Sequence, residues 1–500
     1  MGMDDVEQFK QDVRDGRIDA DRLVELVVKL QRELQAAKRR IEELEKKLGG
    51  SATVKIAEPF SFRAEERRQE ARGKKQRKRK RPSRRGRITT AEKIARAKRT
   101  EQAFPVGVAR SDCKLSHTRP VWRLEGGRAV LVAYDIYRGP KNQFGKIPGV
   151  LGRGEFGIEI IVAIAYQVYI VGLSFDKVCL LLNFFQDLRL RKSQADALLN
   201  QLSRHWESEF NGLCTLLANS AVVHTDETSW SLNSVWAFLS EQVRVLLFGV
   251  PKDAATLQAI LDPATFAGIV VSDDAAVYAN FTQSQKCWAH LLRKAIKLTL
   301  LEPANAEYRE FADRLLEIYR AACRVQRDGR LGDAGRVRKV AALDDEILDL
   351  CAPLWIAELP PLEGPVDDYR LLCNELMRLM LAQQLFTFVT AAPVKMPNGE
   401  ATLVAGTNNE AERTLRSAAT ARKTGRTSKT LRGARRQTIL VSVLESLRQQ
   451  LTTFTLSSVI DEILHWSDAG LSCFAKLLAK LQLTPPSKSR LDLVLPGPSG

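Results

Sequence analysis

The chain has 500 residues, of which 45% are hydrophobic, and a net charge of +17. This length suggests several domains, the apolar content is sufficient for a folded core, and the charge favours a polyanionic partner such as nucleic acid. The eight cysteines include no C-x-x-C pair, which argues against a disulfide scaffold and a cysteine zinc site, and fits a reducing cytosol. No apolar stretch reaches the ~20 residues of a membrane span, so no membrane association is expected.

Residues 1–50 are predicted to form a coiled-coil oligomerisation helix. Between residues 20 and 48, apolar residues occupy both seam positions of a heptad: Val27, Leu34, Ile41 and Leu48 at one, and Leu23, Leu30, Ala37 and Leu44 at the other. This pattern favours a parallel two-stranded coil, and therefore a homo-oligomer that is at least a dimer. The alternative is a single amphipathic helix docked on the body of the protein.

Residues 51–105 are predicted to be a basic DNA-binding linker. Between Arg63 and Arg99 the sequence has 18 Lys or Arg residues against 4 Asp or Glu. Such a block cannot bury enough apolar surface to fold alone, and it should bind phosphates without reading sequence. The alternative is a solvated tail. The candidate phosphate-binding residues are Lys74, Lys75, Arg77, Lys78, Arg79, Lys80, Arg81, Arg84, Arg85 and Arg87.

Short strands and then helices follow the linker. Residues 106–154 are predicted to be a small β region with strands at 121–124 and 128–137 around Gly126-Gly127. Residues 155–215 are predicted to be helical. Two of these helices, at 174–185 and 192–206, fit a helix-turn-helix, although two ordinary packed helices would look the same.

Residues 216–300 are predicted to be the first part of a catalytic core. Three antiparallel strands, a helix at 254–261 and a further strand at 268–272 have the order of a ribonuclease-H-like α/β core. A helical insertion at 301–400 comes before a candidate catalytic helix and basic stretch at 401–430. A helical C-terminal region and a Pro-rich tail, expected to be disordered, complete residues 431–500. The fold class expected is therefore multidomain α+β.

Candidate catalytic acids lie at the ends of two apolar runs and on one helix. Val222-Val223-His224-Thr225 leads into Asp226 and Glu227, and Ile269 to Ser272 leads into Asp273 and Asp274. Two strand-end aspartates and a helix glutamate are the parts of a two-metal site for phosphoryl transfer, because carboxylates are natural ligands of paired divalent ions. Spacing alone does not choose within either pair of acids.

The helix that begins near Thr407 carries two further acids, Glu410 and Glu412. Thr407-x-x-Glu410 fits a capping box, which would give Glu410 a structural role and leave Glu412 free for metal. The alternative for Glu412 is an ion pair with Arg416 one turn later. Arg413 and Arg416 are candidate phosphate contacts, with pairing to neighbouring acids as the alternative. Arg422 and Lys423 open a second basic stretch that is also a DNA-binding candidate.

Four blocks together resemble the insertion-sequence-66 family of bacterial transposases over roughly residues 160–450. They are His224-Thr225-Asp226-Glu227-Thr228, Ser272-Asp273 followed by Tyr278, Cys287-Trp288-Ala289-His290-Leu291-Leu292-Arg293, and Asn408-Asn409-x-Ala411-Glu412-Arg413-x-Leu415-Arg416. The resemblance implies a DDE transposase with a ribonuclease-H-like core, which cleaves DNA at insertion-sequence ends and joins it to target DNA.

On the same resemblance, Asp226, Asp273 and Glu412 are the catalytic, metal-binding triad, with Mg²⁺ or Mn²⁺ as cofactor and two ions expected. Cys287 and His290 would support the active site, because two residues cannot make a zinc site alone. The family's small cysteine zinc module is incomplete here, with only Cys113 and His117, so no zinc is expected.

The partners expected are double-stranded DNA, further copies of the chain, and possible accessory proteins of the same element. The location expected is the bacterial cytoplasm, at the nucleoid. Two alternatives to the transposase remain. One is a catalytically silent DNA-binding relic or repressor, and the other is a structure-selective nuclease without strand transfer.

Overall fold

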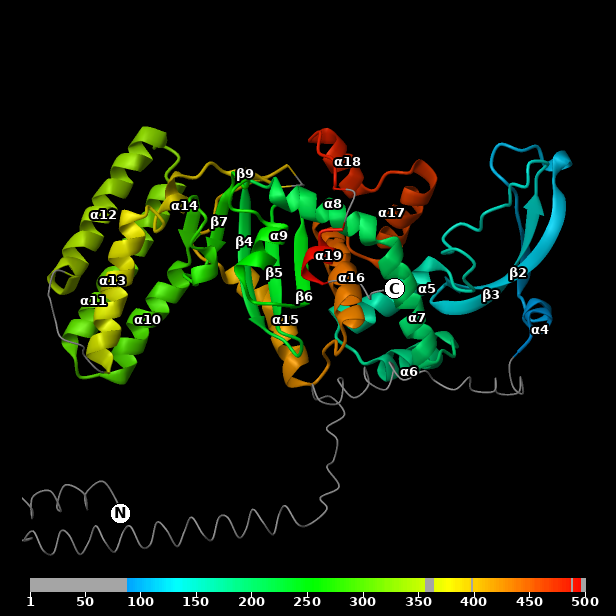
Figure 1. Cartoon of the computed structure of the whole chain (residues 1–500), viewed down its shortest axis with the longest axis horizontal. Coiled ribbons are helices and arrows are strands. Elements are labelled where there is room, and N and C mark those ends of the chain that lie inside the picture. The colour runs from blue at the N-terminus through cyan, green and yellow to red at the C-terminus, as the bar shows by residue number, and fades with distance from the viewer. Residues whose placement is uncertain (1–87, 356–363, 397–398, 487–488, 496–500) are drawn as a thin grey trace, which may run out of the picture. The chain divides into compact units, whose positions relative to one another are not determined.

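The computed structural model describes residues 88–355, 364–396, 399–486 and 489–495 (Figure 1). All of them belong to one compact unit that begins at Lys80. The predicted coiled coil and the linker up to residue 87 lie outside the described residues. The candidate phosphate-binding residues between Lys74 and Arg87 lie outside them as well, so both assignments stay predictions.

A three-stranded sheet forms the first described part of the chain. Its elements are helix α4 (Thr90–Ala95), strand β1 (Arg99–Ala103), the short helix η1 (Arg110–Asp112) and strands β2 (Lys114–Glu125) and β3 (Arg128–Arg138). Strand β3 lies between β1, its parallel neighbour, and β2, its antiparallel neighbour. Gly126 and Gly127 both have positive φ, as a tight hairpin turn requires. The predicted hairpin is confirmed, while α4 and β1 lie in the stretch that the sequence assigned to the linker.

Helices then lead to the central sheet. They are α5 (Ile158–Ala165), the π-helical turn η2 (Tyr166–Ile170), α6 (Phe175–Gln186), α7 (Lys192–His205) and α8 (Glu207–Ala218). The two helices predicted at 174–185 and 192–206 are confirmed within one residue, and they pack on each other. The helix-turn-helix stays a prediction. The outer face of α6 exposes the apolar side chains of Leu180, Phe184 and Phe185, with one basic residue, Lys177, in its first turn.

The central sheet has five strands in the order β6-β5-β4-β7-β8. They are β4 (Val222–Ser229), β5 (Ser234–Ser240), β6 (Arg244–Val250), β7 (Ile269–Ser272) and β8 (Ser284–Lys286), with helices α9 (Ala254–Ile260) and η3 (Ala276–Tyr278) in the connections. Strands β4, β5 and β6 form an antiparallel meander, whereas β4, β7 and β8 are parallel. Strand β7 therefore runs beside the first half of β4 and ends at Ser272, while β4 continues to Ser229.

Helix α16 (Leu431–Gln450) covers strand β6, which is an edge strand of this sheet. Backbone N–H groups of Arg244, Leu246 and Phe248 each donate to a hydroxyl on α16 at 2.9 Å. The accepting hydroxyls are those of Ser446, Ser442 and Thr438, which lie one helical turn apart. An edge strand normally offers unpaired backbone groups to other chains, and here side chains of the same chain occupy them.

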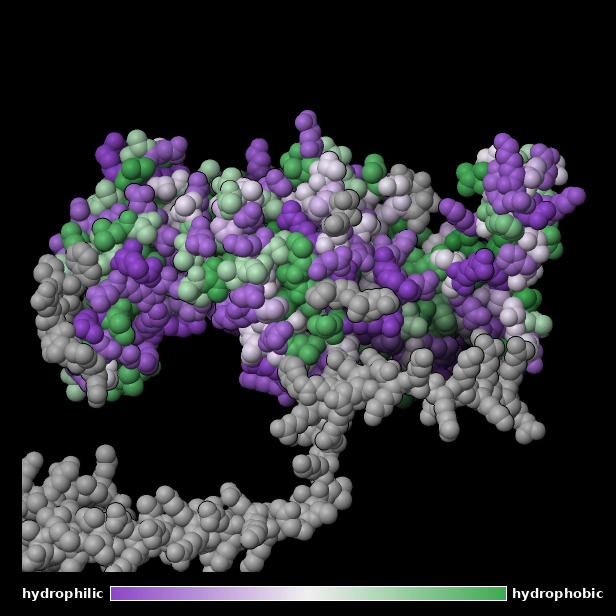
Figure 2. Space-filling model, in the orientation of Figure 1, coloured by the Kyte–Doolittle hydropathy of each residue, from purple (hydrophilic) through white to green (hydrophobic). Residues whose placement is uncertain are grey.

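The region between β8 and the last helix of the site is mainly helical. It comprises α10 (Trp288–Leu301), α11 (Ala306–Arg327), α12 (Asp333–Trp355), α13 (Pro365–Leu381), α14 (Thr387–Thr390) and the two-residue strands β9 (Val394–Lys395) and β10 (Ala401–Thr402). Most of its buried side chains form a core distinct from that of α5–α8 and α16. Figure 1 shows α10–α13 gathered beyond the β7 side of the sheet, and Figure 2 shows a predominantly hydrophilic surface over them.

The chain returns from this helical region to the place where it left the sheet. The N–H of Trp288 donates to the carbonyl of Gly406 at 3.1 Å, and the N–H of Asn408 donates to Sγ of Cys287 at 3.1 Å. Helix α15 (Asn409–Lys423) starts there and packs against β4 and β5. The insertion is therefore closed at its base by hydrogen bonds between its two ends.

Three further helices follow α16, namely α17 (Leu456–Ala469), α18 (Cys473–Lys480) and α19 (Leu491–Val494). Leu491 and Leu495 are buried, and α19 contacts α9. The prediction that the tail is disordered is therefore wrong for residues 489–495, because apolar side chains anchor this segment to the core. No helix in the described ranges combines the length and apolar character needed to cross a membrane.

Candidate active site

Asp226 and Asp273 lie beside each other on two neighbouring strands of the central sheet, β4 and β7. In the parallel pair of β4 and β7, His224 is opposite Val271. Asp226 is two residues beyond His224, and Asp273 is two residues beyond Val271. The register therefore brings the two aspartates, 47 positions apart in the sequence, side by side. Asp273 directly follows the end of β7, whereas Asp226 lies within β4, which continues to Ser229, so the expected strand-end position is wrong for Asp226.

Asp226 and Glu227 differ in their surroundings, because successive residues of a strand point to opposite faces. Glu227 is buried: Tyr278 donates its hydroxyl to Oε2, and the Lys252 ammonium lies 2.6 Å from Oε1. Asp226 is partly exposed. Glu227 is thus held by two side-chain partners in the protein interior, and Asp226 is the acid of this pair that solvent reaches more readily.

The electrostatics of Asp226 show that acidic groups gather around it. Burial raises the pKa of its carboxyl to about 7, and the negative charges of Glu227, Asp273 and Glu412 add to the increase. The backbone N–H of Glu227 opposes this by donating to Oδ1 at 2.9 Å. Asp226 therefore lies in a partly desolvated, negatively charged environment that a bound cation would stabilise.

Asp273 and Asp274 also differ in the partners of their carboxylates. Asp274 forms an ion pair with Arg378 on α13. Asp273 accepts a hydrogen bond from the N–H of Ala275 at 3.1 Å, and no ion pair of Asp273 occurs among the described residues. The ammonium group of Lys286, which is buried, donates to the backbone carbonyl of Asp273 at 3.2 Å. Burial lowers the pKa of Lys286, and this contact fixes the backbone of Asp273.

On α15, both glutamates have partners that the sequence did not indicate. The predicted capping box at Thr407 is wrong, because the N-cap is Asn408 and no side chain caps the helix. Glu410 instead forms a 2.6 Å ion pair with Arg244 on β6. Glu412 forms a 2.6 Å ion pair with Arg293 on α10, not with Arg416. Glu410 therefore has a structural role, as expected, but through a distant partner.

Asn408 connects three elements of the site. Its side-chain amide donates to the carbonyl of Thr225 on β4 at 2.7 Å, while its backbone N–H donates to Cys287 at the start of α10. The residue is fully buried. Because Thr225 precedes Asp226 and Asn408 begins the helix of Glu412, these hydrogen bonds set the position of the helix relative to the strand.

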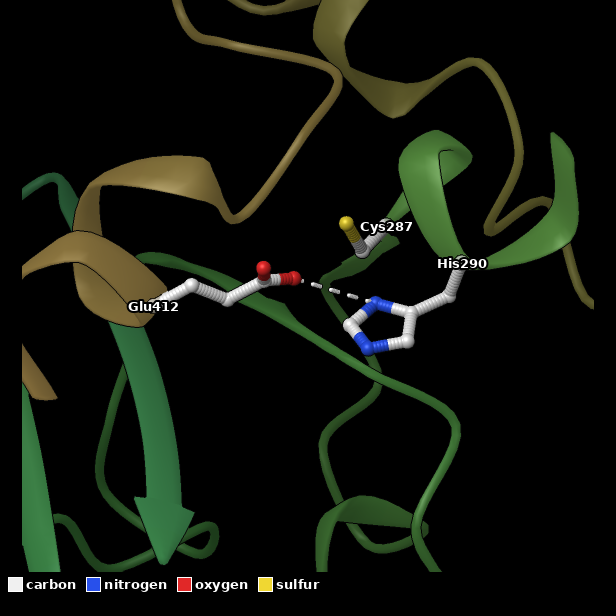
Figure 3. Close-up of side chains that lie close together, drawn as sticks. All are labelled: Cys287, His290 and Glu412. Atoms are coloured by element: carbon white, nitrogen blue, oxygen red, sulfur yellow. Dashed lines mark ion pairs between the residues drawn. The ribbon is translucent and has the colours of Figure 1, made fainter. Parts of the chain in front are cut away.

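Cys287, His290 and Glu412 form a compact group (Figure 3). Their ligand atoms lie within 4.8 Å of one another, and Nδ1 of His290 is 3.6 Å from Oε1 of Glu412. Within the described ranges this is the one group of three such residues that meets this distance. The ligand atoms of Asp226, Asp273 and Glu412 do not meet it, because the Glu412 carboxylate is turned toward His290 and Arg293. Cys287 and His290 therefore lie next to Glu412, a contact that the sequence did not predict, and their supporting role in an active site stays a prediction.

The basic side chains on α15 that are candidate phosphate contacts are all exposed, but they differ in their hydrogen bonds. Arg422 donates to the carbonyl of Ser229 at the end of β4, at 2.9 Å. Among the described residues, Arg413 donates to the carbonyl of Asn409 in its own helix. Arg416 and Lys423 are exposed and form no ion pair with any described residue. Arg413, Arg416 and Lys423 thus leave their charges available at the surface of the helix that carries Glu412.

An open pocket of about 630 Å³ adjoins the site, between α10 and α13. Asp273, Cys287 and His290 contribute to its wall, and so do the basic residues Lys286, Lys294 and Arg378. Lys294 and Arg378 are paired with acids, Glu375 and Asp274 respectively. The pocket gives solvent and small ions a route to the side of the site that faces the insertion.

The site is thus a set of carboxylates on two neighbouring parallel strands, within β4 and directly after β7, faced by a helix with a further carboxylate, in a strongly basic chain. The family model described as Transposase IS66 family matches residues 153–436, which include all of these acids. This match covers more than half of the chain, so the chain belongs to the IS66 family of transposases, and the resemblance seen in the sequence is confirmed. Comparison with curated proteins returned no match.

Proposed function

We propose that this protein is a DDE transposase that cuts DNA at insertion-sequence ends and transfers the strands to target DNA, with Asp226, Asp273 and Glu412 as its metal-binding triad. The observation that carries the proposal is that neighbouring acids differ in whether they form an ion pair with a cationic side chain of the fold. Glu227, Asp274 and Glu410 are each tied to a cationic side chain of the fold. Asp226 and Asp273 form no ion pair with a described residue, and they lie side by side on β4 and at the end of β7. On α15 both glutamates are ion-paired, so this contrast supports the two aspartates, and the choice of Glu412 rests on the family resemblance.

The strand order supports a ribonuclease-H-like core. The meander β4-β5-β6, the helix α9 and the parallel strands β7 and β8 give the sheet that the sequence order predicts, and α15 returns to it after the helical insertion. In such an arrangement one acid comes from the first strand, one from the fourth and one from the late helix. These are the positions of Asp226, Asp273 and Glu412.

The donor set fits Mg²⁺ or Mn²⁺. Carboxylate oxygens are the ligands these hard cations prefer, and the raised pKa of Asp226 shows that its negative charge lacks compensation. Two such ions, when bound, would stabilise the attacking and leaving oxygens of a phosphodiester transfer. Glu412 would join Asp226 by rotating its side chain away from Arg293. Arg413, Arg416 and Lys423, which are exposed nearby, would bind DNA phosphates.

The other expectations stay part of this proposal. The basic linker would hold double-stranded DNA, the N-terminal heptads would pair two copies on two element ends, and accessory proteins of the same element could take part, at the bacterial nucleoid. The presence of all three acids favours an active enzyme over a silent DNA-binding relic. The heptads and linker fit assembly on two DNA ends better than they fit a simple nuclease.

A cleavage assay tests the proposal. Purified full-length protein is incubated with a supercoiled plasmid that carries the DNA flanking its own gene, with Mg²⁺ or Mn²⁺. We expect metal-dependent nicks at defined ends, and their loss in Asp226→Asn, Asp273→Asn and Glu412→Gln, with DNA binding retained.

The matched controls are the neighbouring acids, Asp274→Asn and Glu410→Gln, which the fold engages in ion pairs. These variants should keep cleavage after any loss of stability is taken into account. Loss of cleavage in Asp274→Asn with normal cleavage by Asp273→Asn would reassign the second position. Unfolding of Asp226→Asn, or its loss of DNA binding, would mean that Asp226 has a structural role.

A further inference from the structure

We infer that Cys287, His290 and Glu412 form a second metal site, distinct in ligand chemistry from the carboxylate triad, for a borderline-soft divalent ion such as Zn²⁺. The sequence shows only Cys287 and His290, which are too few ligands. The third ligand comes from α15, 122 positions beyond His290, and only the fold brings it to them. Thiolate, imidazole and carboxylate are each zinc ligands, whereas Mg²⁺ prefers oxygen alone.

The distances suit an ion at the centre of the group. Metal–nitrogen and metal–oxygen bonds of about 2.0–2.2 Å at a tetrahedral angle place the two ligand atoms roughly 3.4 Å apart. Nδ1 of His290 and Oε1 of Glu412 are 3.6 Å apart, which is too long for a hydrogen bond but close to this separation. Figure 3 shows the sulfur of Cys287 beside the gap between them.

The ring nitrogen of His290 is otherwise unused. Nδ1 is shielded from solvent and has no hydrogen-bond partner within the part of the chain that the structure describes. A shielded polar atom without a partner costs free energy, and a metal ion would satisfy it.

The position of Cys287 also suits metal binding. Its sulfur accepts the N–H of Asn408 at 3.1 Å, and the residue caps the start of α10, so sulfur and imidazole are fixed on the same first turn. A backbone N–H donating to sulfur is a typical outer contact of a metal-bound thiolate. Cys287 and His290 both reach the pocket beside α13, which gives an ion access.

The carboxylate of Glu412 already has a cationic partner, the guanidinium of Arg293. Arg293 donates to Oε1 of Glu412 at 2.6 Å, and just over half of the Arg293 side chain is exposed, so it can move into solvent when an ion binds. With the thiol and the carboxylate ionised, a divalent ion would leave the group neutral. The fourth ligand would be water, because three protein ligands leave one position open.

This second site has a functional consequence that rests on the proposed function. An ion held by Cys287 and His290 keeps Glu412 away from Asp226, so Zn²⁺ should inhibit cleavage that Mg²⁺ supports. Binding itself does not depend on that function and is measured without DNA.

The experiment is a titration of the tag-free, metal-stripped full-length protein with Co²⁺, a spectroscopic substitute for Zn²⁺. We expect a thiolate-to-cobalt charge-transfer band and the intense visible bands of a tetrahedral ion, displaced by Zn²⁺. Cys287→Ser should abolish the charge-transfer band, and His290→Ala and Glu412→Gln should weaken Co²⁺ binding by at least about tenfold. Cys473→Ser, a cysteine on α18 outside the group, is the matched control and should leave the spectrum unchanged.

Asp226→Asn separates this site from the catalytic one. The band should persist in that variant, because Asp226 is not a ligand of this group. Absence of the band in the wild type, its persistence in Cys287→Ser, or its loss in Asp226→Asn would overturn the inference. If Cys287→Ser fails to fold, as judged by circular dichroism, His290→Ala and Glu412→Gln decide the result. Mg²⁺-dependent cleavage without a thiolate band would refute only this site, and a thiolate band without cleavage would refute only the proposed function.

Discussion

Arg293 and Glu412 form a 2.6 Å ion pair between α10 and α15, on the carboxylate that the proposed mechanism needs for metal. The same carboxylate is 3.6 Å from His290 and belongs to the helix that packs on β4. The side chain therefore has a cationic partner before any ion arrives. A metal ion that uses Glu412 must first displace a guanidinium.

Removing the guanidinium of Arg293, which competes with a metal ion for Glu412, should strengthen metal binding at the proposed triad. For Arg293→Gln we expect half-saturation with Mn²⁺, measured by electron paramagnetic resonance without DNA, at a concentration lower by up to about fivefold. The reason is that a partly exposed ion pair contributes up to about 1 kcal/mol, which the ion no longer has to overcome. Lys297→Gln, one turn further along α10 and paired with Asp368, is the control and should bind Mn²⁺ as the wild type does. Weaker binding in Arg293→Gln would show that the guanidinium supports the site.

The raised pKa of Asp226 predicts a pH-dependent stability difference. Between the unfolded pKa of about 3.9 and the folded value of about 7, the folded protein holds a proton that the unfolded chain releases. The free energy of unfolding contributed by this group therefore falls as pH rises through that range. Without metal, Asp226→Asn should be more stable than the wild type above pH 7, by about 1–4 kcal/mol.

That difference should shrink below pH 7 and vanish near pH 4, as measured by urea unfolding over a pH series. Saturating Mg²⁺ should stabilise the wild type and not the variant. Asp274→Asn, whose wild-type carboxylate is paired with Arg378, should show no such gain at high pH. A difference of equal size at every pH would argue that the substitution acts through packing rather than through charge.

The contact between α16 and β6 predicts a large effect from one hydroxyl. Ser442 accepts the N–H of Leu246 at 2.9 Å and donates to its carbonyl at 3.2 Å, in the protein interior. Ser442→Ala leaves both backbone groups without a partner, so the free energy of unfolding should fall by about 1–3 kcal/mol. Ser417→Ala on α15, where the serine is exposed, should change it by less than about 0.5 kcal/mol. Equal small effects in the two variants would show that water replaces the lost hydroxyl.

The basic linker predicts the salt dependence of DNA binding. Replacing Lys78, Arg79, Lys80 and Arg81 with Ala should weaken binding to any duplex sequence. It should also make the slope of log K against log salt concentration less steep, by up to roughly 0.9 for each lost phosphate contact. Fluorescence anisotropy at several salt concentrations measures both quantities. An unchanged slope would mean that the linker is a solvated tail and that the DNA contacts lie elsewhere.

The order of the central elements followed from the sequence because local patterns encode it. Apolar runs of strand length ending in acid gave β4 and β7, and helical periodicity gave α6 and α7 nearly to the residue. The side-by-side positions of Asp226 and Asp273 depend on the parallel pairing of β4 with β7, which the local patterns did not specify.

Long-range ion pairs could not be predicted in this way. Arg244 is 166 positions from Glu410, and Arg293 is 119 positions from Glu412, so no local spacing indicates either partner. The capping-box interpretation failed for this reason: a plausible local contact competed with a stronger distant one. The buried Leu491 shows the same limit, because the Pro-rich composition of its surroundings gave no sign of the surface on which it packs.

The closed base of the insertion has a consequence for the way such proteins can diverge. Cys287 and Asn408 are joined by a hydrogen bond although 121 positions separate them. Loops of the insertion that lie away from these contacts, such as the connection between α11 and α12, can be lengthened or shortened without moving Asp273 relative to Glu412, provided that the two ends still meet. Because the cost of closing a loop grows only slowly with its length, the number of residues between the second aspartate and the glutamate is weakly constrained. The insertion is therefore the natural place to graft or remove a module while the acids keep their positions.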